Sequence, residues 1–503
     1  MELFQNIFMG FSIVFEPGNF FACFLGVFIG TLVGVLPGIG PVGAMSLLLP
    51  VTYHLSPISS LVMLAGIYYG SQYGGSTTAI LMNIPGEATS IVSCLDGYKM
   101  AQQGRAGPAL GIAAFGSFIA GTLSLVGLAT IAPPLAIIAI RFGPPEYFGL
   151  MCMGLVLVTY LASGSPIRAL MMAAFGIILG CIGQDPETGS SRLNFGLIDL
   201  FEGIGLVPLA VGLFGISEVF LNIEKSLGKR TFLKTKWRHL LPNKRDWKDS
   251  SLPILRGTVL GFFLGILPGG GALLSSFVSY TVEKRISKHP ERFGKGAIEG
   301  LAGPESANNA ATGGAYIPLL TLGIPSNVVM AVFLGALLIQ GIIPGPQFMQ
   351  KQPGIFWSVV ASMYLGNGML LVLNLPLIGL WIQVLRLPSK ILFPLITLLC
   401  IIGTYSVRNN VFDVALMLIF GVIGYLMQKY NYEPAPMVLA FVLAPLIEDA
   451  FRLSLIMSGG NLLIFFVRPI AAGGMIGALV LLILCVIPYL RKKSKTIPAE
   501  DIS

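Results

Sequence analysis

The chain has 503 residues, of which 54% are hydrophobic and 11% are charged, against about 25% charged residues in soluble domains. Apolar stretches near the length of about twenty residues that crosses a hydrocarbon core recur from Phe20 to Leu490. The sequence therefore predicts an all-α polytopic membrane protein and excludes a nucleic-acid-binding protein or a secreted disulfide scaffold. The net charge of +8 lies mainly in short polar loops, where it indicates topology in the lipid bilayer.

Cysteine and histidine residues give no sign of a metal site. The six cysteines contain no C-x-x-C pair, and the three histidines are far apart in the sequence. We therefore expect no transition metal and no bound cofactor.

The basic segment 222–256 separates two halves of similar length. We predict a first membrane repeat at 1–221, a basic cytoplasmic linker at 222–256, a second membrane repeat at 257–455, and a C-terminal span with a basic tail at 456–503. Helices are expected near 109–132, 147–162, 169–183, 204–221, 355–382, 391–405, 411–428, 435–450 and 471–490.

Three sequence matches in the same order indicate that the two halves are an internal repeat. The paired segments are Gly34–Gly40 with Gly265–Gly271, Gly74–Pro85 with Gly313–Pro325, and Ala169–Gly176 with Ala415–Gly421. The first two pairs imply an offset of 231 residues, then of 239 to 240.

Loop charges indicate that the repeats have inverted topologies. No Lys or Arg precedes Lys99, whereas the equivalent loop of the second half, Glu283–Lys295, holds five. The positive-inside rule then places the two loops on opposite sides of the membrane. It also places the N-terminus in the periplasm and the C-terminus in the cytoplasm.

Basic loops flank Leu252–Tyr280 on both sides, so a simple spanning helix would place one of them outside. A re-entrant hairpin with its tip at Pro268–Gly271 removes this conflict, because glycine permits a tight reversal and proline cannot continue a helix. The first-half equivalent is Asn19–Tyr53, with its tip at Pro37–Gly40. A pair of kinked helices is the alternative. We expect about 9–12 membrane spans in all.

Four polar, glycine-rich elements interrupt the apolar sequence at corresponding places in the two halves. Broken helices at matched positions mark the substrate sites of transporters, because half-helix N-termini attract anions and carbonyl ends attract cations. The predicted substrate-binding residues are Gly38, Gly40, Gly74, Gly75, Ser76, Thr77, Thr78, Asn83, Gly269, Gly270, Gly271, Asn308, Asn309, Thr312, Gly313, Gly314, Ser326 and Asn327. The predicted coupling-ion residues are Glu305, Asn308 and Thr312, and no catalytic residue is predicted.

These elements contain no basic residue, since Lys and Arg are absent between Leu61 and Tyr98 and between Glu299 and Gln350. An anionic substrate would be held by hydroxyl, amide and backbone N–H groups, and a bound cation would offset its charge.

Structural roles are the alternatives for several of these residues. Glycine pairs also form close-packed helix faces, and Glu305 after Pro304 also fits a first-turn acid of a helix. Glu87 fits either a solvated turn or a site carboxylate. Glu448 and Arg452, four residues apart, fit an interfacial ion pair and are left outside the site.

Other function classes lack their motifs. No G-x-x-x-x-G-K-[ST] loop for ATP hydrolysis is present, and no histidine lies near the serine-containing motifs, as a hydrolase would require. A channel built on re-entrant hairpins remains the alternative to a transporter.

Several motifs together resemble those of one known family. The segments are Gly34–Pro41, Tyr73–Gly86, Asp96–Gly104, Pro304–Asn309 and Leu322–Pro325. They resemble the large membrane subunit of the tripartite tricarboxylate transporters, and the resemblance covers nearly the whole chain.

This resemblance implies a permease of the bacterial inner membrane that works with a small four-helix membrane subunit and a periplasmic solute-binding protein. The binding protein would deliver a carboxylate, such as citrate or a related compound. It further implies secondary transport by alternating access, coupled to Na⁺ or alternatively to H⁺. Whether the complex forms a homodimer stays open.

Overall fold

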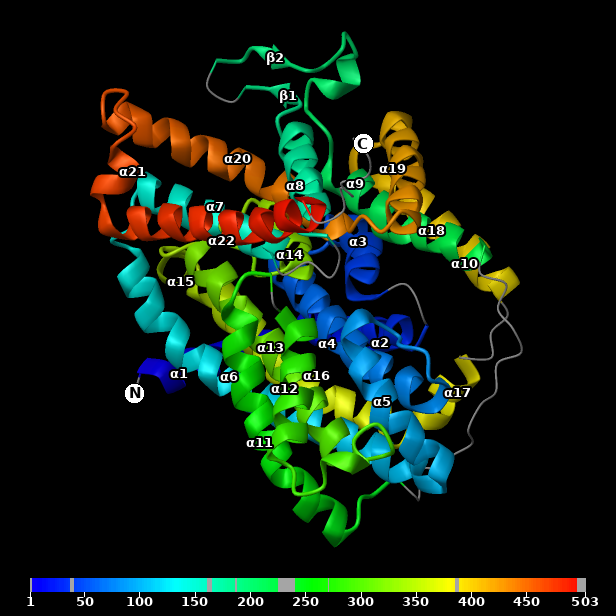
Figure 1. The fold of residues 1–503 in the computed structure, drawn as a ribbon. Helices are drawn as coiled ribbons and strands as arrows, with labels where there is room; N and C mark the ends of the chain where they lie inside the picture. The colour runs from blue at the N-terminus through cyan, green and yellow to red at the C-terminus, as the bar shows by residue number, and fades with distance from the viewer. Residues whose placement is uncertain are drawn as a thin grey trace, which may run out of the picture. The chain divides into compact units, whose positions relative to one another are not determined.

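The computed structural model describes residues 2–36, 40–160, 165–185, 188–224, 240–269, 271–384 and 389–494. Two compact units account for the chain: unit 1 contains Met1–Ala139 and Gly205–Tyr425, and unit 2 contains Ile140–Ile204 and Leu426–Ser503. Figure 1 labels their helices, and each unit is described by itself.

Unit 1 is built from helices. They are α1 (Glu2–Val14), α2 (Pro17–Val35), α3 (Gly40–Thr52), α4 (Pro57–Met82), η1 (Ala88–Ser90), α5 (Ile91–Met100), η2 (Ala101–Arg105), α6 (Ala106–Ala139), α9 (Leu206–Ala210), η4 (Val211–Ile216), α10 (Ser217–Glu224), α11 (Lys244–Ile266), α12 (Gly271–Ile286), η6 (Pro290–Arg292), α13 (Glu299–Leu322), α14 (Val328–Ile339), α15 (Phe348–Lys351), α16 (Pro353–Asn374), α17 (Ile378–Val384), α18 (Ser389–Arg408) and α19 (Val411–Lys429), whose last turn passes the unit boundary.

Unit 2 contains α7 (Pro144–Tyr160), α8 (Pro166–Gly180), β1 (Gly183–Gln184), β2 (Ser191–Arg192), η3 (Ile198–Leu200), α20 (Pro434–Met457), α21 (Ile464–Val467) and α22 (Pro469–Ser494). Its helices α7 and α8 pack against α20, and α22 packs along α7. Glycine allows these close approaches, since a Cβ atom on Gly176 would overlap the carbonyl of Met437.

Membrane-spanning helices confirm the predicted fold class. Five helical segments of the described part are long and apolar enough to cross a membrane: Pro17–Val35, Ala88–Ala139, Leu206–Glu224, Pro353–Asn374 and Val411–Lys429. Each predicted helix overlaps an observed one. The helix expected at 355–382 instead ends at Asn374, because Pro376 lacks the N–H group that would continue it.

A short antiparallel pair, β1 with β2, lies in the segment between α8 and α9, with Gly183 opposite Arg192. The sequence did not predict it. In the predicted linker, residues 225–239 lie outside the described residues, and the end of the linker forms the first turns of α11.

The internal repeat is visible in how two pairs of helices pack, α2 against α4 and α11 against α13. Glycines spaced by four residues let the backbones touch in both pairs: a Cβ atom at any of them would overlap a carbonyl oxygen of the partner helix. The glycines of α2 are Gly26, Gly30 and Gly34, opposite Met63, Ile67 and Ser71 of α4; those of α11 are Gly257, Gly261 and Gly265, opposite Gly303, Ala307 and Ala311 of α13.

These contacts fix the correspondence between the halves. The α2 and α11 glycines differ by 231 in number (257 less 26), and their partners differ by 240 (303 less 63). Gly74 meets the backbone of Thr31, and Gly314 meets that of Phe262, again at offsets of 240 and 231. The offset of 239 expected for the glycine pairs is thus wrong by one residue: Gly74 corresponds to Gly314.

The central helices α4 and α13 cross in opposite directions. Ser76 near the end of α4 contacts Glu305 near the start of α13, whereas Tyr68, two turns earlier, packs against Tyr316. Nearly every residue of both helices is buried. Antiparallel equivalent helices are what inverted repeats require. Helices of the two repeats also pack against each other. α6 of the first repeat contacts α13 of the second, and α16 of the second repeat contacts α4 of the first.

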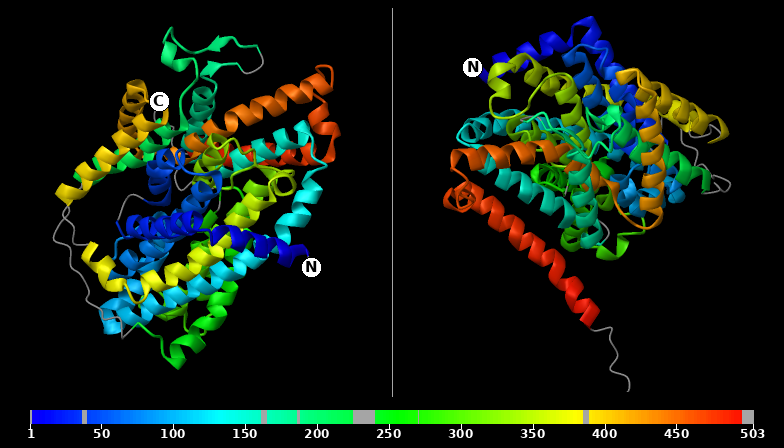
Figure 2. Two further views of the ribbon diagram at one scale, coloured as in Figure 1. Left: turned by 180° about the vertical axis from the view of Figure 1, so that it is seen from behind. Right: turned by 90° about the horizontal axis from the view of Figure 1, so that it is seen from above.

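Both predicted hairpins are helix pairs that break at the predicted tips: α2 ends at Val35 and α3 begins at Gly40, while α11 ends at Ile266 and α12 begins at Gly271. The second pair is held antiparallel by Arg256, whose guanidinium donates to Glu283 at 2.8 Å and 2.5 Å. At the edge of unit 1, α1 lies along α16 (Figure 2).

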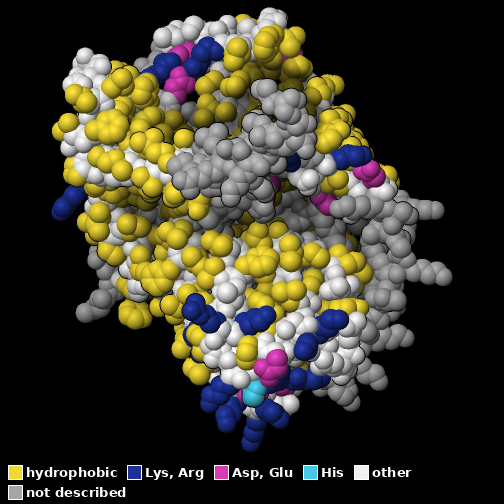
Figure 3. All heavy atoms as spheres, in the orientation of Figure 1, with side chains coloured by type: hydrophobic (Ala, Val, Ile, Leu, Met, Phe, Trp, Pro, Cys, Tyr) yellow, Lys and Arg dark blue, Asp and Glu magenta, His cyan; other side chains and the backbone are white. Residues whose placement is uncertain are grey.

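Exposed basic side chains gather at one end of unit 1, next to apolar helix faces (Figure 3). They come from the start of α11, from the last turn of α12 and from the segment between α12 and α13: Lys244, Arg245, Lys248, Lys284, Arg285, Lys288, Arg292 and Lys295. The loop charges predict that this end faces the cytoplasm.

Candidate functional site

A cavity of about 450 Å³ lies in unit 1 where both hairpins meet the segments that follow α4 and α13. Its volume is in the range of small-molecule sites. Its lining residues are Gly40, Pro41, Val42, Tyr68, Gln72, Pro85, Gly86, Glu87, Ala88, Thr89, Phe214, Gly269, Gly271, Ala272, Leu273, Asn327, Val328 and Val329. No Lys or Arg is among them.

Helix N-termini converge on this cavity. The first residues of α3, α12 and α14 line it, and so does η1, the turn that opens α5. The first turn of a helix carries backbone N–H groups without helical partners and the positive end of the helix dipole. A cavity surrounded by such termini is suited to an anion without a basic side chain.

The hairpin tip of the second repeat is fixed to the segment after α13, since the backbone N–H of Gly269 donates to the carbonyl of Ser326 at 2.7 Å. Asn327 caps α14 by accepting from the N–H of Met330 at 2.9 Å, and its amide group lies 3.4 Å from the Tyr68 hydroxyl. These hydrogen bonds fix the positions of Gly269, Asn327 and Tyr68 in the cavity wall.

Polar side chains of the first repeat form a cluster at the cavity wall. With its amide nitrogen toward Glu87, Gln72 donates to Glu87 Oε2 at 3.2 Å and to Asn308 Oδ1 at 2.8 Å. Thr89 also donates to the Glu87 carboxylate. Glu87 is 7% exposed, so the alternative of a solvated turn is wrong.

Glu305 lies behind this cluster, fully buried within α13. Its carboxylate accepts from Ser76 at 2.6 Å and from Ser93. Because α13 begins at Glu299, the alternative of Glu305 as a first-turn acid is wrong. Within the described ranges neither Glu87 nor Glu305 forms an ion pair, so no basic side chain there offsets their charge.

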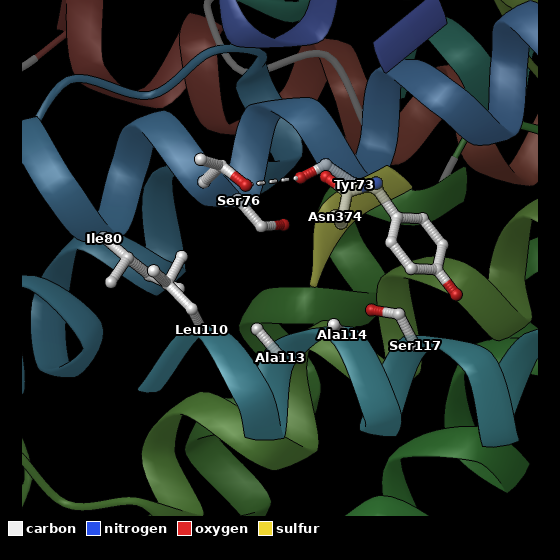
Figure 4. Close-up of a pocket in the computed structure, with 9 residues that line it drawn as sticks. Tyr73, Ser76, Ile80, Leu110, Ala113, Ala114, Ser117 and Asn374 are labelled. Carbon is white, nitrogen blue, oxygen red and sulfur yellow. Dashed lines mark hydrogen bonds between the residues drawn. The ribbon is translucent and has the colours of Figure 1, made fainter. Parts of the chain in front are cut away.

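The predicted site residues divide into groups. Four line the cavity: Gly40, Gly269, Gly271 and Asn327. Asn308 and Glu305 belong to the polar network beside it. Gly38 and Gly270 lie outside the described residues. Ser76 and Thr77 line a second, much smaller cavity between α4, α6 and Asn374 (Figure 4).

The other predicted residues make contacts within the helix framework. Thr78 donates to the carbonyl of Val35, Asn309 to Ser117, Thr312 to the carbonyl of Asn308, and Ser326 to that of Ala315. Asn83 is the exposed left-handed C-cap of α4, with φ of 57°. None of these five residues lines the large cavity.

The expected helix breaks at Gly74–Thr78 and Asn308–Gly314 are wrong, because α4 and α13 run through both segments without interruption. Gly74 and Gly314 instead touch the backbones of α2 and α11, and Gly313 meets Ser124. Gly75 meets the Glu87 side chain. The breaks fall one or two turns later, after Met82 and Leu322.

Tyr68, Gln72, Gly86 and Thr89 line the cavity but were not predicted. A sequence signal existed for part of this set: Tyr68, Gln72 and Ser76 are polar residues at four-residue spacing and so share one face of a helix. Thr89 is brought to the site by the turn after the break in α4, which the sequence did not locate.

Comparison with known proteins now decides the family. The model of the tripartite tricarboxylate transporter TctA family matches residues 20–439. The chain belongs to the TctA family. It is therefore a multi-pass membrane subunit of a three-part transporter, which also includes a binding protein and a small membrane subunit, and it is not an enzyme.

Two relatives from Agrobacterium vitis extend the TctA match. An "uncharacterized 52.8 kDa protein in TAR-I ttuC' 3'region" is 49% identical over 501 residues, the whole of both chains. An "uncharacterized protein in TAR-II ttuC' 3'region" is 51% identical over 241 residues, all of that protein and 48% of this chain. No solved structure matches this chain.

Proposed function

We propose that this TctA-family chain is the permease of a secondary active transporter that imports a carboxylate received from a periplasmic binding protein across the bacterial inner membrane. The observation that carries the proposal is the cavity of about 450 Å³ lined by the N-terminal turns of α3, α12 and α14. Three helix N-termini supply N–H donors and positive dipole ends for carboxylate oxygens.

The size of the cavity and the helix N-termini in its wall favour a small organic acid. Donors lie on several sides: the Tyr68 hydroxyl and the Asn327 amide line the wall beside the N–H groups of the first turns of α3, α12 and α14. Citrate or a related di- or tricarboxylate could use several of these donors at once.

Coupling to a cation follows from the charge balance. Glu87 lines the same cavity, and a carboxylate ion beside a carboxylate substrate is repelled unless a cation or a proton accompanies it. We propose Na⁺ as the coupling ion, with H⁺ as the alternative, and we place the coupling step at Glu305 and its neighbours Asn308 and Thr312.

Alternating access would expose the cavity to each side in turn by moving one set of helices against another. In this proposal the N-terminus faces the periplasm and the basic end of unit 1 faces the cytoplasm.

The test is radiolabelled citrate uptake in cells that express this chain with its small subunit and binding protein. An inward Na⁺ gradient is compared with Na⁺-free buffer at fixed pH, and a panel of di- and tricarboxylates follows. We expect Na⁺-dependent accumulation against a gradient. Equilibration without accumulation would favour the channel alternative, and no uptake of any carboxylate would overturn the proposal.

The site placement is tested separately with Asn308→Ala and Thr77→Ala. We expect at least one of them to alter uptake or its ion dependence. Wild-type behaviour of both variants would contradict the placement.

A further inference from the structure

A second, much smaller chamber lies between α4, α6 and the end of α16, apart from the large cavity (Figure 4). Its volume is about 10 Å³, the room that one water molecule or one small ion occupies. Side chains of Leu110, Ala113 and Ala114 close one side, while Ser76, Thr77 and Ser117 contribute hydroxyl groups.

One buried oxygen in the wall has no partner. Asn374 is 4% exposed, and its Nδ2 group donates to the carbonyl of Leu370 at 2.9 Å, which fixes the orientation of the amide. Its Oδ1 atom accepts no hydrogen bond. A buried amide oxygen without a partner costs about 1–3 kcal/mol, so a bound species that satisfies it is favoured.

Two of the hydroxyl groups are arranged as acceptors, whereas the Ser117 oxygen already accepts from the Asn309 amide at 2.7 Å and keeps one lone pair. Ser76 gives its proton to Glu305 at 2.6 Å, which leaves oxygen lone pairs free. Thr77 donates to the Tyr73 carbonyl at 3.4 Å. The Tyr73 hydroxyl is already used, because it donates to Asn367 at 2.7 Å.

The carboxyl group of Glu305 lies next to the chamber wall. Glu305 is bonded to Ser76 and forms no ion pair within the described ranges. A cation in the chamber would lie on the far side of the Ser76 hydroxyl from this carboxylate, and the low dielectric of the interior would strengthen their attraction. Small, hard cations prefer oxygen ligands of this kind.

We propose that this chamber binds one dehydrated monovalent cation of sodium size through Ser76, Thr77, Ser117 and Asn374, with Glu305 as the neighbouring counter-charge. This chamber would be the binding site of the coupling ion in the proposed function, on which the inference rests. Its ligands differ from the predicted set of Glu305, Asn308 and Thr312. In the second repeat, Tyr316 stands at the position equivalent to Ser76 (316 less 240), so the symmetry-related position lacks this hydroxyl ligand.

The test measures cation binding without transport. The full chain, purified with its small subunit, is heated in increasing NaCl at constant ionic strength with choline chloride, and the midpoint of unfolding is followed. We expect NaCl and LiCl to raise the midpoint more than KCl. Ser117→Ala and Asn374→Leu should raise the half-effective NaCl concentration at least tenfold.

Two variants separate binding from structure. Ser124→Ala removes another buried hydroxyl of α6, which donates to the Gly121 carbonyl outside the chamber, and should shift the NaCl response less than twofold. Asn374→Asp keeps an oxygen ligand and should retain the response that Asn374→Leu loses.

The outcomes distinguish this inference from the proposed function. If NaCl has no effect beyond choline chloride, or if Ser117→Ala and Asn374→Leu respond like Ser124→Ala, the chamber holds water and the inference falls. If the wild type then still accumulates carboxylate with Na⁺, the proposed function stands without this site. If the NaCl response is as expected but no carboxylate is taken up, the inference stands and the proposed function falls.

Discussion

The two repeats of unit 1 share a backbone framework but differ in the side chains that they present at its centre. Three glycines of α2 and three of α11 make the same backbone contacts with α4 and α13, at constant offsets of 231 and 240. Both central helices end in a left-handed C-cap, Asn83 with φ of 57° and Gly323 with φ of 73°.

The polar residues do not follow this symmetry. At the offset of 240, Glu305 corresponds to Ala65, Gln72 to Thr312, and Glu87 to Asn327. Both buried carboxylates therefore lack a counterpart. The two repeats therefore share the helix framework in inverted orientation, whereas the buried polar network occurs once, where α4 and α13 cross.

The largest expected effect comes from adding side chains at the glycines where two helix backbones touch. Gly30→Val and Gly261→Val would each force a side chain into the carbonyl of the facing helix. We expect each to cost about 3 kcal/mol or more and to leave little folded protein in the membrane, as measured by the monodisperse fraction after extraction.

The control for the framework is Gly368→Ala on α16, where no atom lies within 4 Å of the added methyl group. This variant should accumulate like the wild type. If Gly30→Val were tolerated while Gly261→Val was not, the two glycine ladders would not be equivalent.

Much of this framework could be predicted from the sequence, because hydrophobic length, glycine-proline motifs and loop charge are local signals. The tips at Pro37–Gly40 and Pro268–Gly271 and the approximate positions of the helices followed from them. The glycine pairs at Gly74 and Gly313 were misjudged as helix breaks, since a glycine that packs and a glycine that breaks a helix look alike until the facing helix is known.

The site was harder to predict, because its residues come from segments that only the fold brings together. Gly40, Gly271 and Asn327 were found, since each lies at the start of a half-helix. Thr89 was missed, because no pattern in the sequence shows that the turn after α4 folds back to the cavity. Ser117 and Asn374 were missed for the same reason.

The second test replaces the Glu305 carboxyl group, which has no counterpart in the first repeat. Glu305→Gln keeps the size of the side chain but gives the second repeat a neutral residue, as Ala65 does in the first. Two charge-assisted hydrogen bonds are weakened, and at about 1.5–3 kcal/mol for each such bond uptake should fall on the order of tenfold to a hundredfold, with loss of Na⁺ dependence.

Ser93→Ala serves as the graded companion, because it removes one donor to Glu305 and leaves the charge. It should lower uptake less than Glu305→Gln and keep Na⁺ dependence. Retained ion coupling in Glu305→Gln would show that the buried carboxylate acts only in folding.

A third pair of variants compares equivalent positions directly. Gln72 lines the cavity, whereas Thr312 donates to the carbonyl of Asn308 in its own helix at 3.1 Å. Gln72→Ala should raise the half-saturating carboxylate concentration about tenfold, because it removes a hydrogen bond that holds Glu87 at the cavity wall. At saturating Na⁺, Thr312→Ala should change this concentration less than twofold. Equal effects would mean that both repeats contact the substrate alike.

The smallest expected effect concerns a link between the repeats that also lacks a symmetric partner. Asp96 of α5 accepts from the backbone N–H groups of Gly296 and Ala297 at 2.7 Å and 2.8 Å, and from the Tyr280 hydroxyl at 3.0 Å. The position equivalent to Asp96 is Ala336, so this link exists only at the basic end of unit 1.

Tyr280→Phe removes one of the three bonds and keeps the ring against Phe293. The free energy of unfolding should fall by about 1 kcal/mol, read as a lower midpoint of thermal unfolding. Tyr425→Phe is the matched control, because its hydroxyl donates to the exposed Glu224 carboxylate and water can replace that bond. If the two variants lost equal stability, the Asp96 link would contribute no more than a surface contact. Helix packing alone would then hold the two repeats together at the basic end of unit 1.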